Sequence, residues 1–116
     1  MSYDLAVWDG DRPLNNHQAG STCDELYERY LESDDVVVPP APGITAYVEA
    51  LVARYPDDVD RSVVWASPPV IEEASGQIVY LVMRYGKAEE VSQYAASLAR
   101  ERGLTCFDPQ GECLLP

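Results

Sequence analysis

The sequence predicts an α+β fold: a ferredoxin-like split βαβ sandwich with an additional N-terminal helix and with its helices on one face of a mixed sheet. Strand-like segments stand before, between and after segments with helical periodicity. The predicted order is strand, two helices, two strands, helix, strand, which contains the split βαβ order plus one early helix. At 116 residues, the chain is expected to form one acidic domain over residues 1–116.

The first strand is predicted over residues 3–8, which are rich in aromatic and branched side chains. Turn-forming residues 9–13 end it, and the polar residues 15–20 are expected to form a surface loop. A helix is then predicted to begin at Thr22, because Thr22 and Glu25 have the spacing of a capping box. Its apolar stripe has four members at helical spacing: Leu26, Tyr27, Tyr30 and Leu31.

The second helix is predicted from about residue 44 to residue 55, and Pro56 ends it. Residues 36–43, between the two helices, combine a valine run with a proline-rich stretch, so we expect an extended connector there. The apolar face of the second helix has six members: Ile44, Tyr47, Val48, Leu51, Val52 and Tyr55. We expect the tyrosines of both helical stripes to be structural.

Two short segments, residues 62–65 and 70–73, resemble strands, but Pro68 and Pro69 separate them. At most one of the two segments therefore belongs to a central strand. Residues 77–84 are nearly continuously apolar and are the best candidate for a central strand that is buried on both faces.

The C-terminal third contains the clearest helix, predicted over residues 87–102 with Gly103 as its C-terminal cap. A strand over residues 104–107 and a turn over residues 108–111 follow. Residues 112–115 could add a short final strand.

The charge balance excludes several classes of partner. Twenty Asp and Glu against eight Lys and Arg give a net charge of −12. Such a chain repels phosphate backbones and anionic lipid, so we expect no nucleic-acid partner and no membrane partner. No apolar stretch approaches the ~20 residues of a membrane helix, and the start of the chain lacks the pattern of a secretion signal. We expect a soluble, cytoplasmic protein, although acidity also serves solubility alone.

The three cysteines, Cys23, Cys106 and Cys113, are an odd number, which favours reduced thiols in a cytoplasmic chain. A disulfide between Cys106 and Cys113 across a terminal hairpin stays open. The chain has no Cys-x-x-Cys pair, and its one histidine, His17, lies in a polar stretch. We therefore expect no metal site, no cofactor and no catalytic residue.

Acidic residues recur in groups along the chain. The pair Glu89 and Glu90 falls in the first turn of a helix, where carboxylates favour the positive end of the helix dipole. The other groups fall in predicted loops or strand ends, which carry binding functions disproportionately but also need polar residues. The sequence leaves open whether these groups form one acidic face: Asp34 and Asp35; Asp57, Asp58 and Asp60; Glu72 and Glu73.

Adjacent acids in a strand, such as Glu72 and Glu73, point to opposite faces and are not expected to share a proton or a metal. Trp65 precedes a proline-containing loop near the acids of residues 57–60, and we expect it to be partly exposed, although tryptophan more often packs in a core. An aromatic side chain beside carboxylates suits an interface. The candidate partner-binding residues are Asp34, Asp35, Asp57, Asp58, Asp60, Trp65, Glu72 and Glu73.

Both ends of the chain resemble a group of small bacterial proteins. The group opens with a Ser-Tyr-Asp-Leu strand, here residues 2–5, and closes with a Gly-Leu-x-Cys-Phe-Asp-Pro-Gln segment, here residues 103–110. Between the ends, residues 46–58, 78–83 and 88–90 resemble its proline-terminated helix, its apolar strand and its Ala-Glu-Glu helix start. Proteins of the group are mostly uncharacterised, and some resemble immunity proteins encoded beside polymorphic toxins.

The resemblance implies a protein that binds and neutralises a cognate toxin domain, and it supplies no binding residues. Residues 59–75 match the group least. We expect an immunity-type protein, not an enzyme, whose acidic surface contacts a basic face of the toxin. Two alternatives stay open. One is a small ligand-binding domain or enzyme, with Glu72, Asp108 or a tyrosine lining a pocket; the other is an adaptor module that forms a homodimer.

Overall fold

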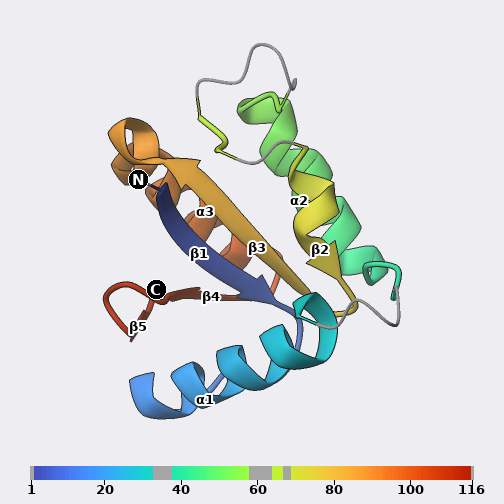
Figure 1. The fold of residues 1–116 in the computed structure, drawn as a ribbon, viewed down its shortest axis with the longest axis vertical. Helices are drawn as coiled ribbons and strands as arrows, with labels where there is room; N and C mark the ends of the chain where they lie inside the picture. The colour runs from blue at the N-terminus through green and yellow to red at the C-terminus, as the bar shows by residue number, and fades with distance from the viewer. Residues whose placement is uncertain (1, 33–37, 58–63, 67–68, 116) are drawn as a thin grey trace.

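The computed structural model describes residues 2–32, 38–57, 64–66 and 69–115. Their order along the chain is drawn in Figure 1. The elements are β1 (Ser2–Trp8), α1 (Asn16–Leu26), the π-helix η1 (Tyr27–Leu31), α2 (Pro42–Arg54), the 3₁₀ helix η2 (Val70–Glu73), β2 (Ala74–Ser75), β3 (Ile78–Arg84), the 3₁₀ helix η3 (Tyr85–Lys87), α3 (Ala88–Glu101), β4 (Thr105–Asp108) and β5 (Cys113–Leu114).

The fold is α+β, with five strands in the order β2-β3-β1-β4-β5. Every pairing between these strands is antiparallel, so the expectation of a mixed sheet is wrong. The reason is topological: α3 connects β3 to β4, and β1 lies between those two strands. Strands that run in the same direction are therefore not neighbours. The prediction of a central strand over residues 77–84 is confirmed, because β3 pairs with β1 on one side and with β2 on the other.

Helices cover both faces of the sheet, so the expectation of helices on one face is also wrong. Successive side chains of a strand point to opposite faces. Leu5 and Val7 belong to a hydrophobic cluster with α2 and α3, whereas Ala6 and Trp8 belong to a second cluster with α1. In Figure 1, α3 runs behind β1 and β3, and α1 lies across the lower end of the sheet. A strand whose residues 5–8 are all 0% exposed needs cover on both sides.

The first helix begins six residues earlier than predicted. Asn15 caps α1, and its side-chain oxygen accepts a hydrogen bond from the Gln18 backbone N–H at 2.9 Å. The loop predicted over residues 15–20 and the capping box at Thr22 are therefore wrong. The buried face of α1 consists of residues at i, i+4 and i+7, namely Ala19, Cys23 and Leu26.

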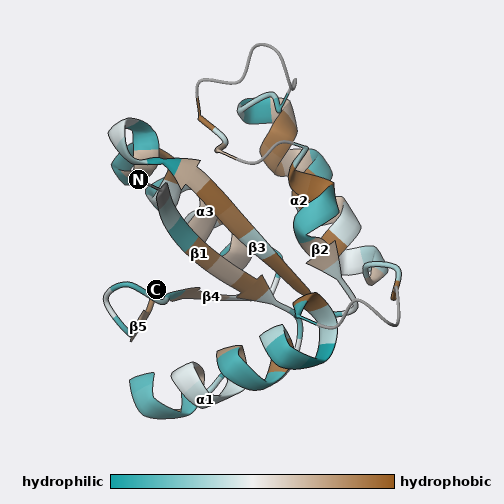
Figure 2. Cartoon of the chain, viewed as in Figure 1, coloured by the Kyte–Doolittle hydropathy of each residue, from teal (hydrophilic) through white to brown (hydrophobic). Residues whose placement is uncertain are grey.

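The other two long helices confirm the predictions within two residues at most of their ends. Pro42 stands in the first turn of α2, where its missing N–H costs nothing. Gly103 follows α3 with a φ of +71°, which fits a C-terminal cap. None of the described helices combines the length and the apolar character needed to cross a bilayer. In Figure 2 the hydrophobic colouring concentrates on β1, β3 and α2, while α1 is largely hydrophilic.

The segment between α2 and β3 differs most from the prediction. Residues 70–73 form a 3₁₀ helix and not a strand. Trp65 forms an isolated bridge with Met83, and hydrogen bonds join Ala66 N–H to Val82 O (2.9 Å) and Arg84 N–H to Val64 O (2.6 Å). This segment therefore extends the edge of the sheet beside the far end of β3.

Gly76 joins three parts of the fold at the turn before β3. Its φ is +54°, and its carbonyl accepts a hydrogen bond from Ala41 N–H at 2.7 Å, next to the start of α2. A Cβ atom at this position would lie 2.4 Å from Cε1 of Tyr30 in η1. The turn thus requires glycine both for its backbone and for the space beside Tyr30.

We predict that Gly76→Ala lowers the free energy of unfolding by about 2 kcal/mol or more, because the alanine strains the backbone and displaces the Tyr30 ring. Gly103→Ala is the matched control: its φ is also positive, but nothing lies within 4 Å of the added carbon. Its loss should be about 1 kcal/mol. Urea unfolding measures both values, and equal losses would show that Tyr30 moves aside freely.

Candidate functional site

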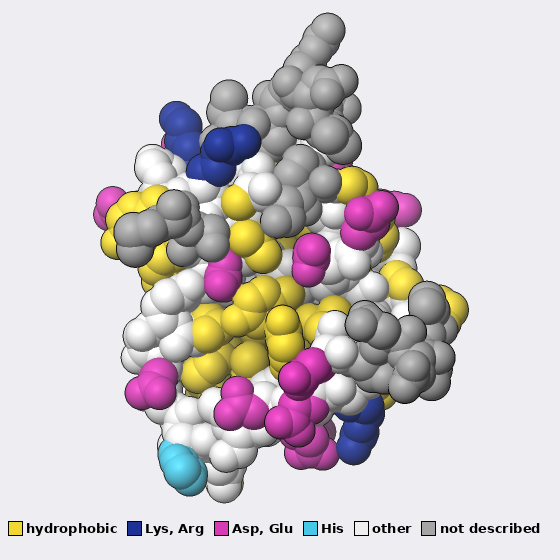
Figure 3. Space-filling model, viewed as in Figure 1, with side chains coloured by type: hydrophobic (Ala, Val, Ile, Leu, Met, Phe, Trp, Pro, Cys, Tyr) yellow, Lys and Arg dark blue, Asp and Glu magenta, His cyan; other side chains and the backbone are white. Residues whose placement is uncertain are grey.

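Beside α1, the sheet face carries a groove of about 590 Å³ between α1, β3 and the turn that joins β4 to β5. We call it the α1 groove. Figure 3, viewed as in Figure 1, shows hydrophobic side chains gathered in the middle of this face and carboxylates around them. The groove is lined by Asn16, His17, Gly20, Ser21, Cys23, Asp24, Tyr27, Tyr80, Phe107, Pro109 and Glu112.

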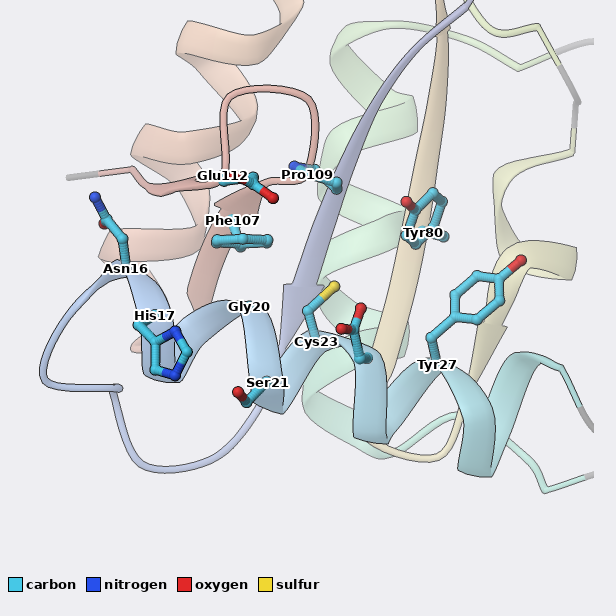
Figure 4. A pocket seen from close by; sticks show the side chains of 11 residues that line it. Asn16, His17, Gly20, Ser21, Cys23, Tyr27, Tyr80, Phe107, Pro109 and Glu112 are labelled. Atoms are coloured by element: carbon cyan, nitrogen blue, oxygen red, sulfur yellow. The ribbon is translucent and has the colours of Figure 1, made fainter.

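Two tyrosines form one wall of the α1 groove (Figure 4). The ring centroids of Tyr27 and Tyr80 are 5.2 Å apart and the ring planes meet at 69°, an edge-to-face arrangement. Tyr27 is the first residue of the π-helix η1 and is 40% exposed, so its assignment to a buried core stripe is wrong. The wider π turn changes the direction of the side chains after Leu26, and π-helices occur frequently at functional sites.

The charged surroundings of this tyrosine pair are acidic. Asp24 and Glu112 line the groove directly. Burial and the nearby carboxylate of Asp4, with smaller effects from Cys23, Tyr27 and Asp24, raise the pKa of Tyr80 to about 12. Carboxylates on a helix and on a strand thus act on the same hydroxyl, and a negative potential extends over the groove.

Glu73 extends the acidic region beyond the groove. Burial, together with the neighbouring charges of Glu72 and Asp4, raises the pKa of the Glu73 carboxyl. Like charges held close together disfavour their own ionisation.

The two buried thiols, Cys23 in the groove and Cys106 on the opposite face of the sheet, are unsuited to nucleophilic chemistry. Burial, with a contribution from Asp24, raises the pKa of Cys23 to about 11, and burial with Asp108 raises that of Cys106 to about 12. Both therefore stay protonated at neutral pH. Cys106 and Cys113 are free cysteines. Among the described residues, no three His, Cys, Asp or Glu side chains lie where they could hold a metal ion.

The structure places only part of the predicted binding set. Asp34, Asp35, Asp58 and Asp60 lie outside the described residues. The half-buried carboxylate of Asp57 accepts a hydrogen bond from the Val70 backbone N–H at 2.8 Å, which is a structural contact at the start of η2.

Trp65 is 1% exposed, so the expectation of partial exposure is wrong. Its indole N–H donates to the Tyr55 carbonyl at 2.8 Å, and its ring belongs to the cluster with α2 and α3. A side chain enclosed in this way cannot anchor a partner. Trp65 is buried because it packs in the same hydrophobic cluster as residues of α2, which the sequence around Trp65 did not indicate.

Glu72 and Glu73 lie on η2, so the argument that placed them on opposite faces of a strand is wrong. Glu72 is exposed and Glu73 is half-buried. The charge of Asp4 is one of the causes that raise the pKa of Glu73. Among the predicted binding residues that the structure describes, Glu73 is thus the one connected to the acidic region of the α1 groove.

Sequence reasoning missed the residues that line the groove. Tyr27 and Tyr80 were assigned to buried elements. Asp4 does not line the groove, but its charge raises the pKa of Tyr80, and it was treated only as part of a strand. One signal was present. Asp4 precedes four buried residues. It also alternates with Ala6 and Trp8, so all three side chains point to the face of the sheet that α1 covers. A carboxylate in that row indicates that the cover by α1 ends there.

The two chain ends that carry the resemblance contact each other. The Tyr3 hydroxyl donates a hydrogen bond to Asp108 Oδ2. The Gln110 side chain pairs with the Asp4 backbone, with N–H to Oε1 at 2.5 Å and Nε2 to the carbonyl at 2.7 Å. Asp108 Oδ1 also accepts from the backbone N–H groups of Gln110 (3.0 Å) and Gly111 (3.1 Å).

This network assigns a structural role to both motifs. Burial raises the pKa of Asp108, but the hydrogen bonds from Tyr3, Gly111 and Gln110 outweigh it and hold the pKa below its ordinary value. The hydrogen bond to Asp108 and burial raise the pKa of Tyr3 to about 12. Residues of the two segments therefore fix the β4–β5 turn against β1.

Comparison of the chain with protein-family models, with curated proteins and with solved structures yields no match. The geometry and the charge of the α1 groove are therefore the evidence that bears on function, and the resemblance of the chain ends stays a prediction.

We predict that Tyr3→Phe lowers the free energy of unfolding by about 1.5–3 kcal/mol at pH 7, because it removes a hydrogen bond to a carboxylate. The loss should shrink as pH falls below about 4, since a lowered folded-state pKa of Asp108 stabilises the fold only while the carboxyl is ionised. In the native protein, the contribution of the Tyr3 hydroxyl should be lost as pH rises from about 10 to about 12.

Tyr85→Phe is the control for this prediction, because the Tyr85 ring meets the Tyr3 ring edge to face and Tyr85 is 62% exposed. It should change stability by less than about 0.5 kcal/mol. Urea unfolding at several pH values measures both variants. A Tyr3→Phe loss that is equal at pH 3 and pH 7 would show that the ionised carboxylate of Asp108 contributes nothing.

Proposed function

We propose that this protein is an immunity-type protein that neutralises a cognate toxin domain by direct, stoichiometric contact, and that the α1 groove receives a basic face of the toxin. One observation carries the proposal: an exposed tyrosine, Tyr27, and a half-buried one, Tyr80, line a groove whose charged side chains, among the described residues, are Asp24 and Glu112. Aromatic anchors with a charged rim are the usual composition of a protein interface.

The overall charge supports the same assignment. A net charge of −12 attracts a basic protein from a distance and can raise its association rate by ~10- to 1000-fold at low salt. The same charge opposes docking of a second copy, because two acidic grooves repel each other. The heteromeric interpretation is therefore favoured over the homodimeric adaptor.

We infer further that the fold is a split βαβ arrangement to which α1 has been added. Support comes from the order of β2, β3, β1 and β4 in the sheet, and from α2 and α3 sharing one face. In this interpretation α1 is the extra helix on the face that such a fold leaves open. The groove then exists because α1 covers that face only in part.

A small-ligand site is the second candidate, because a groove of about 590 Å³ has the size of small-molecule sites. The acidic lining would select a cationic ligand. The two candidates differ in outcome, since a ligand-binding protein needs no toxic partner.

We predict that co-expression of this protein rescues a sensitive bacterium from the product of the adjacent upstream reading frame. Survivor counts with and without the protein measure this. Toxicity without rescue, or no toxicity from the product of any adjacent reading frame, contradicts the immunity function and favours the small-ligand site.

With the purified complex, the double reversal Asp24→Lys/Glu112→Lys should slow association by about tenfold or more and reduce its salt dependence. The control Glu49→Lys/Glu101→Lys changes the net charge equally, at exposed positions of α2 and α3. It should have a clearly smaller effect. Stopped-flow kinetics at two salt concentrations compare the pairs, and equal effects would remove the α1 groove from the interface.

A further inference from the structure

We propose that the α1 groove contains a recognition site for one arginine side chain of the partner, whose guanidinium stacks on the Tyr27 ring and is hydrogen-bonded by the Asp24 carboxylate. This inference rests on the proposed function and names the chemistry of the same site. It follows from the local geometry of Asp24 and Tyr27, and from a second tyrosine pair in the same molecule.

Asp24 and Tyr27 are neighbours on one helical surface. The Tyr27 backbone N–H bonds to the carbonyls of both Asp24 and Cys23, so Tyr27 lies one turn after Asp24. Both side chains line the groove. At 40% exposure, Tyr27 can still accept a planar group on its ring. A carboxylate one helical turn from an open aromatic ring is the combination that a guanidinium uses.

The molecule contains an occupied counterpart of this arrangement. Tyr55 and Tyr94 also meet edge to face, with centroids 5.5 Å apart and planes at 81°. The Arg54 guanidinium lies over both rings, 4.5 Å from the Tyr55 centroid and 5.9 Å from the Tyr94 centroid. The pKa of Tyr55, which burial raises most, also responds to the carboxylate of Glu90. Here a tyrosine pair, a carboxylate and an arginine occur together.

The groove repeats the tyrosine pair and the carboxylate without the arginine. Among the described residues, both cation–ring contacts are made by Arg54, and neither involves Tyr27 or Tyr80. Arg29, the arginine nearest along the helix, is instead paired with Glu25 at 3.2 Å. In the part of the chain that the structure describes, the Tyr27 ring is therefore not occupied by a cation of the protein itself.

Arginine fits this site better than lysine does. A guanidinium is planar, so it can lie flat on Tyr27 while its N–H groups reach the carboxylate of Asp24. An ammonium group is compact and strongly hydrated, and it gains less from the ring. The site should therefore distinguish the two side chains at equal charge.

The test uses blocked hexa-arginine and hexalysine peptides as probes, with fluorescence anisotropy at about 150 mM salt to limit diffuse attraction. We expect the arginine peptide to bind at least about threefold more tightly than the lysine peptide. Asp24→Asn and Tyr27→Ala should each weaken arginine-peptide binding by about three- to tenfold. Tyr27→Phe, which keeps the ring, should stay within about twofold.

The matched control is Glu49→Gln, which removes one charge from an exposed position on α2. It should change binding by less than about twofold. Equal binding of the two peptides, or equal weakening by Asp24→Asn and Glu49→Gln, overturns the arginine site. Asp24 is exposed, so this comparison stands even where Tyr27→Ala impairs folding.

The arginine site and the immunity function can fail separately. If the protein rescues growth but the peptides show no arginine preference, the site is overturned and the function stands. If the arginine preference is found and depends on Asp24 and Tyr27, while no neighbouring product is toxic and rescued, the function is overturned and the site stands.

Discussion

The central position of β1 is the constraint on which the rest of the structure depends. Its residues 5–8 are fully buried, which requires β3 and β4 on its two edges and helices on both of its faces. α2 and α3 supply a broad cover on one side. On the other side α1 contributes a short stripe of buried residues, and the acidic groove lies beside it. The candidate site is thus a consequence of unequal helical cover on the two faces of the sheet.

The hydrogen-bond network at the other end of β1 separates stability from recognition. Tyr3, Asp108 and Gln110 join the first strand to the last turn, and they belong to the two most specific motifs of the chain. These side chains connect the two ends of the chain and therefore contribute to the stability of the fold. The residues that would select a partner, such as Asp24 and Tyr27, lie outside both motifs.

The long periodic segments could be predicted, and the local deviations could not. The apolar faces of α2 and α3 span three turns or more, which makes their period unambiguous. The start of α1 was missed because Asn15 and Thr22 are both good caps, and only the tertiary burial of Ala19 decides between them. Tyr27 was misplaced because a helical wheel assumes 3.6 residues per turn, whereas η1 is wider.

The most direct test of the account is a map of the surface that a basic ligand contacts. Backbone amide shifts of the ¹⁵N-labelled protein would be followed by NMR during titration with the blocked hexa-arginine peptide. The account predicts that the largest shifts fall on Asp24, Tyr27, Tyr80 and Glu112, on three separate segments that meet only in the α1 groove. Largest shifts on the exposed faces of α2 or α3, with the groove unchanged, would contradict it.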